Sequence, residues 1–320
     1  MVVRLSKDFS FVISPPLPFN FDATVHKPSH FPTPIFSYSK GIIVQSTVMN
    51  GQQYGLILRD TSSKDSTHVE VTVYSHHSMD KKSREKAKNE ICYRYQLQED
   101  ISSFSQEFVN DDLLGPVLER LRGMRLSSGY SLYELAVVTL VLQNATIRRT
   151  TTMLGALLDN FGQVVKFRNH QLPIFWMPSS IAKVSESRLR EIGLGYRARF
   201  LSSISKAFTN DIEHQLREVP KEKASEVLLG LHGIGPVSCQ ILLCEGLKHY
   251  DAFDVLPLFE QKVFSRLLFN RDLVDKEDIL DFACSHFGKW RALAMHYLWE
   301  DLFRRRKVES IAWLDRLIRL

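Results

Sequence analysis

The stretch LLGLHGIGPVSCQILLCE, residues 228–245, holds two apolar runs with helical spacing that meet at Gly233-Ile234-Gly235. Glycine supplies the backbone angles that a tight reversal needs, and Pro236 suits the first position of a following helix. The stretch therefore predicts two short helices joined by a hairpin, with backbone N–H groups exposed where the second helix begins. Such a hairpin can bind a phosphate through the main chain alone. This points to a nucleic-acid backbone as the partner.

The composition is that of a folded protein with an ordinary core. The 320 residues are 44% hydrophobic and 24% charged, and the net charge of +5 is compatible with a polyanionic partner without establishing one. The chain opens without a signal-peptide pattern and has no apolar run long enough to span a bilayer. We therefore expect an intracellular protein with no membrane partner, cytoplasmic in a prokaryote or nuclear in a eukaryote.

The four cysteines are Cys92, Cys239, Cys244 and Cys284. Because no two of them form a CxxC pair, neither a zinc ribbon nor an iron–sulfur cluster is expected. The histidines, including the pair His76-His77 and the pair His26 and His30, are expected on loop and strand surfaces rather than at a metal site.

The N-terminal third has the alternating pattern of β-strands. Residues 9–14 and 67–74 alternate, and the runs 41–49 and 53–59 flank Asn50-Gly51, which is a strong hairpin signal. A proline-rich loop is expected between the first strand and this hairpin. The charged run DKKSREKAKNE that follows the strands predicts a solvated helix face or a linker.

From about residue 113 the chain has helical spacing almost throughout. The segments that show it are 133–141, 151–161, 187–192, 199–208, 224–231, 237–243, 261–269, 277–287 and 291–303. We therefore expect an α+β protein, with a small antiparallel β domain and charged linker over residues 1–100 and an all-helical domain over residues 101–320.

Two further segments place polar side chains at helix ends. In TLVLQNATIRR an apolar helix ends at Gln143-Asn144, whose side chains cap the helix or, on a surface that faces DNA, wedge into the base stack. In GLGYRARF, Arg197 and Arg199 alternate with aromatic residues, either as solvated side chains or as contacts to a phosphate backbone. The basic run RRRK, residues 304–307, is expected to be a solvated helix end.

The segment FGKWRALAMHYLW, residues 287–299, is rich in aromatic side chains. Most of them are expected in the core. One that lies at a pocket wall can stack on a planar base.

Four segments, in this order, resemble the helix-hairpin-helix superfamily of DNA glycosylases. They are SLYELAVVTLVLQNATI, KVSESRLREIGLGYRARF, LLGLHGIGPVSCQILLCEGLKHYDAF and FGKWRALAMHYLW. The branches they are most similar to are the bacterial 3-methyladenine glycosylase II and 8-oxoguanine glycosylase, both of which carry an N-terminal antiparallel β domain. The resemblance implies an enzyme that rotates a damaged nucleotide out of the duplex into a pocket.

The resemblance also implies roles for particular residues. The positions expected at the DNA interface are Gly233, Ile234, Gly235, Val237, Gln143, Asn144 and Arg197. In the family the hairpin carbonyls hold a monovalent cation, here assigned to Gly233 and Gly235, and no other cofactor is required. Trp299 matches an aromatic residue that lines the base pocket. The implied partner is double-stranded DNA with a lesion, bound by a monomer.

The pattern departs from the family at the catalytic carboxylate. The family places an aspartate at the start of the next helix, where its charge stabilises the sugar cation as the glycosidic bond breaks. Counted from Gly235, that position falls on Leu256, or on Leu258 with a small shift. Asp254 can take its place, Glu260 can reach in from the next helix, or the protein binds without catalysis. Asp254 is the residue assigned here.

The lysine nucleophile of bifunctional family members is missing as well, since Pro236-Val237-Ser238 follow the hairpin. The expected function is therefore a monofunctional DNA N-glycosylase that removes an alkylated or oxidised purine in base excision repair. The alternative is a glycosylase-fold protein that binds DNA or recognises damage without releasing a base.

Overall fold

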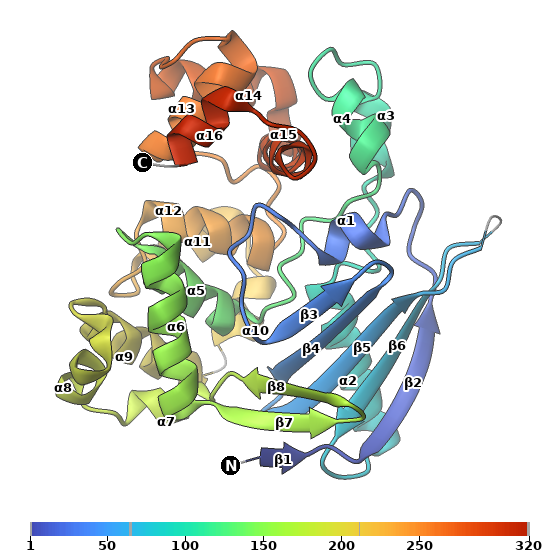
Figure 1. The fold of residues 1–320 in the computed structure, drawn as a ribbon, viewed down its shortest axis with the longest axis vertical. Helices are drawn as coiled ribbons and strands as arrows, with labels where there is room; N and C mark the ends of the chain where they lie inside the picture. The colour runs from blue at the N-terminus through green and yellow to red at the C-terminus, as the bar shows by residue number, and fades with distance from the viewer. Residues whose placement is uncertain (1, 64–65, 211, 319–320) are drawn as a thin grey trace.

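The computed structural model describes residues 2–63, 66–210 and 212–318, which form two β-sheets and a large helical body (Figure 1). The larger sheet is antiparallel, in the order β2-β6-β5-β4-β3. Its strands are β2 (Lys7–Ile13), β3 (Phe36–Ser39), β4 (Ile42–Met49), β5 (Gln52–Asp60) and β6 (Val69–Ser75). The strands that the sequence predicted in this region are confirmed, and so is the α+β class.

The β4–β5 hairpin turns where the sequence predicted it. Asn50 and Gly51 both have positive φ, 49° and 74°. A two-residue turn that continues the twist of the flanking strands needs positive φ at both central positions, which asparagine and glycine tolerate best. The register of the pair follows, with Met49 opposite Gln52.

A second sheet crosses the expected domain boundary. Strand β1 (Val2–Arg4) runs parallel to β7 (Gln163–Phe167), which pairs with β8 (His170–Ile174). The expectation of helix throughout the second half is therefore wrong over this hairpin, and the β region is not confined to residues 1–100. Strands β7 and β8 cover one face of the larger sheet, where Val165 and Phe167 of β7 pack against Ile57 and Tyr74.

Helix α2 (Lys81–Arg94) covers the opposite face of the larger sheet (Figure 1). Its residues Ala87, Ile91 and Cys92 are buried against the β5 side chains Leu56 and Leu58, which point away from Ile57 because strand side chains alternate between faces. The charged run was expected to be a solvated face or a linker. It forms the first turns of this helix with mostly exposed side chains, as the first of these alternatives predicted, and its Ala87 belongs to the buried stripe.

The helical body has two hydrophobic clusters. One surrounds α5, which is buried along nearly its whole length, and the other joins α3, α4, α14 and α15. No helix in the described ranges has both the length and the apolar character needed to cross a membrane. The helices are α1 (Phe21–Val25), α3 (Ser102–Phe108), α4 (Gly115–Leu121), α5 (Leu132–Leu142), α6 (Ile147–Phe161), α7 (Pro178–Ala182), α8 (Glu186–Leu189), α9 (Arg197–Ala207), α10 (Ile212–Arg217), α11 (Lys221–Leu229), α12 (Pro236–Ile241), α13 (Leu258–Phe269), α14 (Lys276–Phe287), α15 (Arg291–Arg306) and α16 (Ala312–Ile318).

Candidate nucleic-acid interface and base pocket

The predicted hairpin joins α11 to α12, and a π-turn, η3 (Leu242–Gly246), continues α12. Gly233 has a φ of +108°, and a Cβ there would lie 2.5 Å from the Cβ of Phe200, so only glycine fits. Gly235 is the N-cap of α12, and the space where its Cβ would stand has no atom within 4 Å. The main chain at the start of α12 can therefore be approached closely from outside. Ile234 is buried beneath the turn, while Val237 is 38% exposed.

Gln143 supports the hairpin from the end of α5. Its side-chain Nε2 donates a hydrogen bond of 2.8 Å to the carbonyl oxygen of Gly233 and lies 3.4 Å from the Ser238 hydroxyl. Its own carbonyl accepts a hydrogen bond from Arg197. Asn144 is exposed in a left-handed conformation with φ 45°. Of the two candidates for a wedge, Gln143 is bound to the hairpin, whereas Asn144 is exposed and makes one long contact of 3.5 Å to the Tyr196 hydroxyl.

The expectation that Arg197 contacts a phosphate needs correction. Its side chain is 7% exposed and its guanidinium lies 4.5 Å from the centroid of the Tyr196 ring, so it stabilises the turn before α9. Arg199, two residues along, is exposed and can reach a backbone phosphate.

The carbonyl of Gly233 has one lone pair occupied by Gln143, which leaves one for a cation. A monovalent cation at Gly233 and Gly235 stays a prediction.

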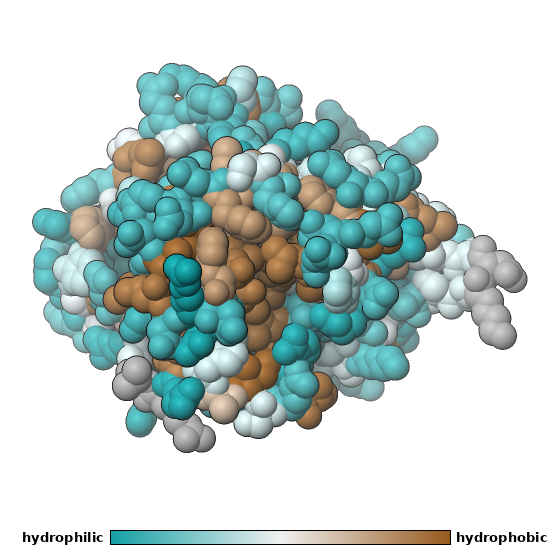
Figure 2. All heavy atoms as spheres, turned by 90° about the horizontal axis from the view of Figure 1, so that it is seen from above, coloured by the Kyte–Doolittle hydropathy of each residue, from teal (hydrophilic) through white to brown (hydrophobic). Residues whose placement is uncertain are grey.

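A cavity of about 600 Å³ is lined by Leu142, which precedes the Gln143 that binds the hairpin, and by Ile241 of α12, the helix that begins at the hairpin. Its walls come from residues 24–38, α5, the α12–η3 helix, α13 and α15, and they are mostly apolar and aromatic. The larger apolar and aromatic residues of the lining include Phe31, Phe36, Tyr38, Ile43, Tyr95, Tyr130, Leu135, Val138, Leu142, Ile147, Ile241 and Trp299. On the face shown in Figure 2, hydrophobic side chains gather along the middle of the molecule between hydrophilic margins. A cavity of this character suits a planar, largely apolar ring.

Trp299 lies at the wall of this cavity, and its role at a base pocket, which the resemblance implies, stays a prediction. Its ring packs at centroid distances of 5.9 Å from Phe259, 5.8 Å from Phe264 and 4.8 Å from Phe303. Three aromatic neighbours from two helices hold the indole in place, so it presents a rigid surface to whatever enters the cavity.

Asp254 is not among the residues that line the cavity. Its side chain is 60% exposed and its carboxylate pairs with Arg291 at 3.1 Å and with Lys221 at 4.0 Å. Two cations already neutralise it on the outer surface. The sequence-based assignment of Asp254 as the catalytic carboxylate therefore has no support from its position.

Glu260, by contrast, lines the cavity from the first turn of α13. Burial raises its pKa to about 7. Its position at the cavity agrees with the alternative in which Glu260 reaches in from the next helix, and a catalytic role for it stays a prediction. Glu260 shares a helix face with the buried residues Val263 and Phe264, and this i, i+3, i+4 spacing was the sequence signal that could have found it.

A group of buried charged residues at the cavity was not foreseen. The Lys27 ammonium donates hydrogen bonds to the carbonyls of Thr24 at 2.7 Å and Ser127 at 2.5 Å, and burial lowers its pKa. Glu245 of η3 also lines the cavity, and burial raises the pKa of its carboxyl. His30 was expected on a loop surface, yet burial lowers its pKa to about 3.

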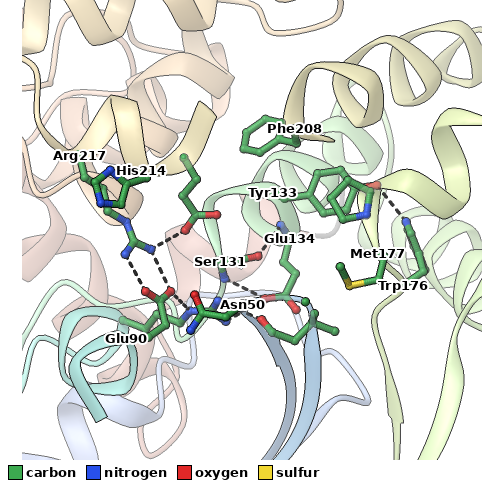
Figure 3. A pocket seen from close by; sticks show the side chains of 15 residues that line it. Asn50, Glu90, Ser131, Tyr133, Glu134, Trp176, Met177, Phe208, His214 and Arg217 are labelled. Atoms are coloured by element: carbon green, nitrogen blue, oxygen red, sulfur yellow. Dashed lines mark hydrogen bonds and ion pairs between the residues drawn. The ribbon is translucent and has the colours of Figure 1, made fainter. Parts of the chain in front are cut away.

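A second cavity, of about 250 Å³, lies between α2, α5, α7 and α10 (Figure 3). Its charged residues are paired with one another. Arg217 binds Glu90 at 2.6 and 2.9 Å, Arg94 binds Glu90 at 2.6 Å, and Glu134 closes a capping box with Ser131 at 2.8 Å. These contacts connect α2 to the helical body, and among the described residues Glu134 Oε1 and Arg217 Nε have no hydrogen-bond partner.

The known proteins to which this chain is similar carry the names of DNA glycosylases. No family model matches the chain. A probable N-glycosylase/DNA lyase of Methanothermobacter thermautotrophicus is 22% identical over 237 residues, which are 68% of this chain and 75% of the relative. The N-glycosylase/DNA lyase OGG1 of Arabidopsis thaliana is 28% identical over 166 residues, which are 49% of this chain and 43% of the relative.

Solved structures match over nearly the whole chain. A 3-methyladenine DNA glycosylase from Archaeoglobus fulgidus superposes with a TM-score of 0.76 at 21% identity, covering 94% of this chain and 100% of that one. An 8-oxoguanine glycosylase/lyase of Clostridium acetobutylicum, in complex with double-stranded DNA, superposes with a TM-score of 0.66 at 17% identity, covering 91% and 93%. The chain therefore has the fold of the helix-hairpin-helix DNA glycosylases. The resemblance noted in the sequence is confirmed. The relatives of this chain carry the names of DNA glycosylases.

Proposed function

We propose that this protein is a monofunctional DNA N-glycosylase that removes a damaged or modified purine by base flipping. One observation carries the proposal: an exposed main-chain hairpin adjoins an aromatic-walled cavity that contains a desolvated carboxylate. The hairpin grips the phosphate backbone of lesion-bearing double-stranded DNA, and the cavity receives the everted base. The purine class rests on the names of the two solved structures above, which act on 3-methyladenine and 8-oxoguanine.

We assign the catalytic role to Glu260 rather than Asp254. When the glycosidic bond breaks, the base leaves with the bonding electrons and the sugar carbon becomes cationic. A carboxylate in a site with little water stabilises that cation far better than one in solvent, and water then adds to the carbon. Glu260 stands in such a site, whereas Asp254 is solvated and already paired.

Monofunctional chemistry follows from the residues at the hairpin. Val237 and its neighbours offer no amine to attack the sugar, and Lys27 at the cavity is held by two carbonyl oxygens. The product is therefore an abasic site with an intact strand. The protein acts as a monomer, in the compartment that holds the DNA.

The test is a panel of duplexes with alkylated and oxidised purines, each scored for abasic sites after incubation with the wild type, Glu260→Gln and Asp254→Asn. We expect base release by the wild type on at least one lesion, its loss in Glu260→Gln with duplex binding retained, and its survival in Asp254→Asn. Loss in Asp254→Asn with survival in Glu260→Gln would return the role to Asp254.

One observation favours a second function, damage recognition without catalysis. Leu256, one of the two positions that the sequence offers for the family's catalytic aspartate, is 8% exposed and packs in the core, and neither it nor Leu258 is among the residues that line the cavity. If the wild type binds lesion duplexes, with affinity that falls as salt rises, yet leaves no abasic site on any lesion of the panel, this second function replaces the first.

A further inference from the structure

Three side chains from distant parts of the chain converge beside the cavity. They are His30 of the loop between α1 and β3, Glu245 of η3, and His296 of α15. Their potential ligand atoms lie within 4.8 Å of one another, and they form the one such group in the searched ranges 2–63, 66–210 and 212–318. His30 and Glu245 line the cavity, with His30 Nε2 standing 3.8 Å from Glu245 Oε1.

One of these groups lacks the partner that a buried polar atom normally has, and a second has only a histidine as its ion-pair partner. The Nε2 atom of His296 is buried and makes no hydrogen bond to any described residue. The side chain of Glu245 is 13% exposed. Its ion-pair partner within the described ranges is His30, and no lysine or arginine of these ranges forms an ion pair with it within 4 Å. Buried polar groups are almost always satisfied, so the unpartnered Nε2 atom of His296 indicates something that binds there, next to Glu245.

Nearby cations do not fill that role because they are engaged elsewhere. Lys27 donates to two carbonyl oxygens, and Arg304 pairs with Glu300 at 3.0 Å and donates to the carbonyl of His26. Glu300 also accepts a hydrogen bond of 2.5 Å from the Ser29 hydroxyl. These contacts fasten the loop to α15.

Because that loop is fastened, His30 is held against His296. The two rings lie 5.8 Å apart between centroids and are inclined by 72°. In addition, Glu245 stands on a π-turn, a distortion of the helix that is frequent at functional sites. The three groups are thus placed in advance by the fold rather than brought together by chance on a mobile surface.

We propose that His30, Glu245 and His296 bind one divalent transition-metal ion of the zinc class. Two imidazoles and one carboxylate are a ligand set that such ions use where a further coordination position stays open. Metal–ligand bonds of about 2.1 Å require only small side-chain movements from the spacing seen here. The open position faces the cavity, because His30 and Glu245 stand at its wall. The site does not depend on the proposed glycosylase activity.

The first test is a titration of metal-stripped protein with Co²⁺, followed by visible absorption, and with Zn²⁺, followed by calorimetry. We expect one equivalent to bind, with a visible band typical of a low-coordinate cobalt site and a higher midpoint of thermal unfolding. His296→Asn and Glu245→Gln should each weaken binding at least tenfold. The matched control is His26→Asn, because His26 lines the same cavity but stacks on Tyr38 outside the cluster.

Absence of stoichiometric binding by the wild type would overturn the proposal. So would binding that survives both ligand substitutions, or that falls equally in His26→Asn. If a ligand variant fails to fold by circular dichroism, X-ray absorption of the zinc-loaded wild type decides. Two imidazole nitrogens with oxygen donors support the site, and any other ligand set refutes it.

Discussion

The side-chain amide of Gln143 donates a hydrogen bond of 2.8 Å to the carbonyl oxygen of Gly233, which ties the end of α5 to the turn of the hairpin. The residue after it, Asn144, is exposed. Neighbouring polar residues at one helix end therefore have different tasks, one supporting the hairpin and the other facing the solvent where a duplex would lie.

Gln143→Ala should lower the free energy of unfolding by about 1 kcal/mol, because it leaves the Gly233 carbonyl short of a partner. It should also weaken binding to undamaged duplex. Asn144→Ala should leave both unchanged but reduce base eversion, measured by the fluorescence of 2-aminopurine beside the lesion. Equal effects of the two substitutions on stability would contradict this division of tasks.

The two glycines of the hairpin should respond oppositely to alanine. Gly233→Ala should destabilise the protein by about 2 kcal/mol or more, because its φ is +108° and the new Cβ meets Phe200. Gly235→Ala should keep or slightly raise stability, since its φ is −93° and the space is open.

The same Gly235→Ala substitution puts a methyl group where a phosphate would approach. We therefore expect duplex affinity to fall about tenfold, a loss of binding free energy on the order of 1.4 kcal/mol. The denaturation midpoint should not fall. Unchanged affinity in a fluorescence-anisotropy titration would remove the hairpin from the DNA interface.

The stability of the protein should depend on pH through Glu260. Its pKa is raised from 4.5 to about 7 in the folded protein, so between these values the folded state holds more protons than the unfolded state. Stability contributed by the neutral carboxyl is then lost as pH rises, and the loss is complete above about pH 7. Glu260→Gln should be near neutral at pH 4.5 and stabilising by at most about 3 kcal/mol at pH 8. Urea unfolding at both pH values measures this.

The rate of base release should also depend on the protonation state of Glu260. It should be higher with the ionised carboxylate, whereas stability is higher with the neutral carboxyl. Only the ionised carboxylate of Glu260 stabilises a sugar cation, so single-turnover rates should rise about tenfold per pH unit below pH 7 and level off above it. A rate that falls with rising pH through 7 would mean that the neutral acid is the active form.

Placing an aspartate at the position that it has in the family should not produce a catalytic site in this protein. Leu256→Asp places a charge in the core among Phe253 and Phe264, and we expect a loss of about 3 kcal/mol or more without a gain in base release. Leu258→Asp is the comparison, because Leu258 is the other position that the sequence offers for the family aspartate and is 59% exposed in the first turn of α13, where a negative charge is tolerated or favourable. Thermal unfolding and abasic-site assays of both variants test this.

The sequence by itself determined the elements whose cause is local. The Asn50-Gly51 turn, the Gly233-Ile234-Gly235 hairpin and its flanking helices follow from backbone conformations that few residues accept, so short patterns were enough to predict them. The four segments that resemble the helix-hairpin-helix DNA glycosylases, taken in their order along the chain, likewise indicated the fold.

Only the tertiary structure decided which side chains meet at the cavity. Asp254 and Glu260 are close in sequence, yet one is paired on the surface with Arg291 and the other is desolvated beside Trp299. His30 and His296 are brought together by a loop packed on a distant helix. Burial and charge pairing arise from contacts between segments far apart in the chain, and no local pattern encodes them.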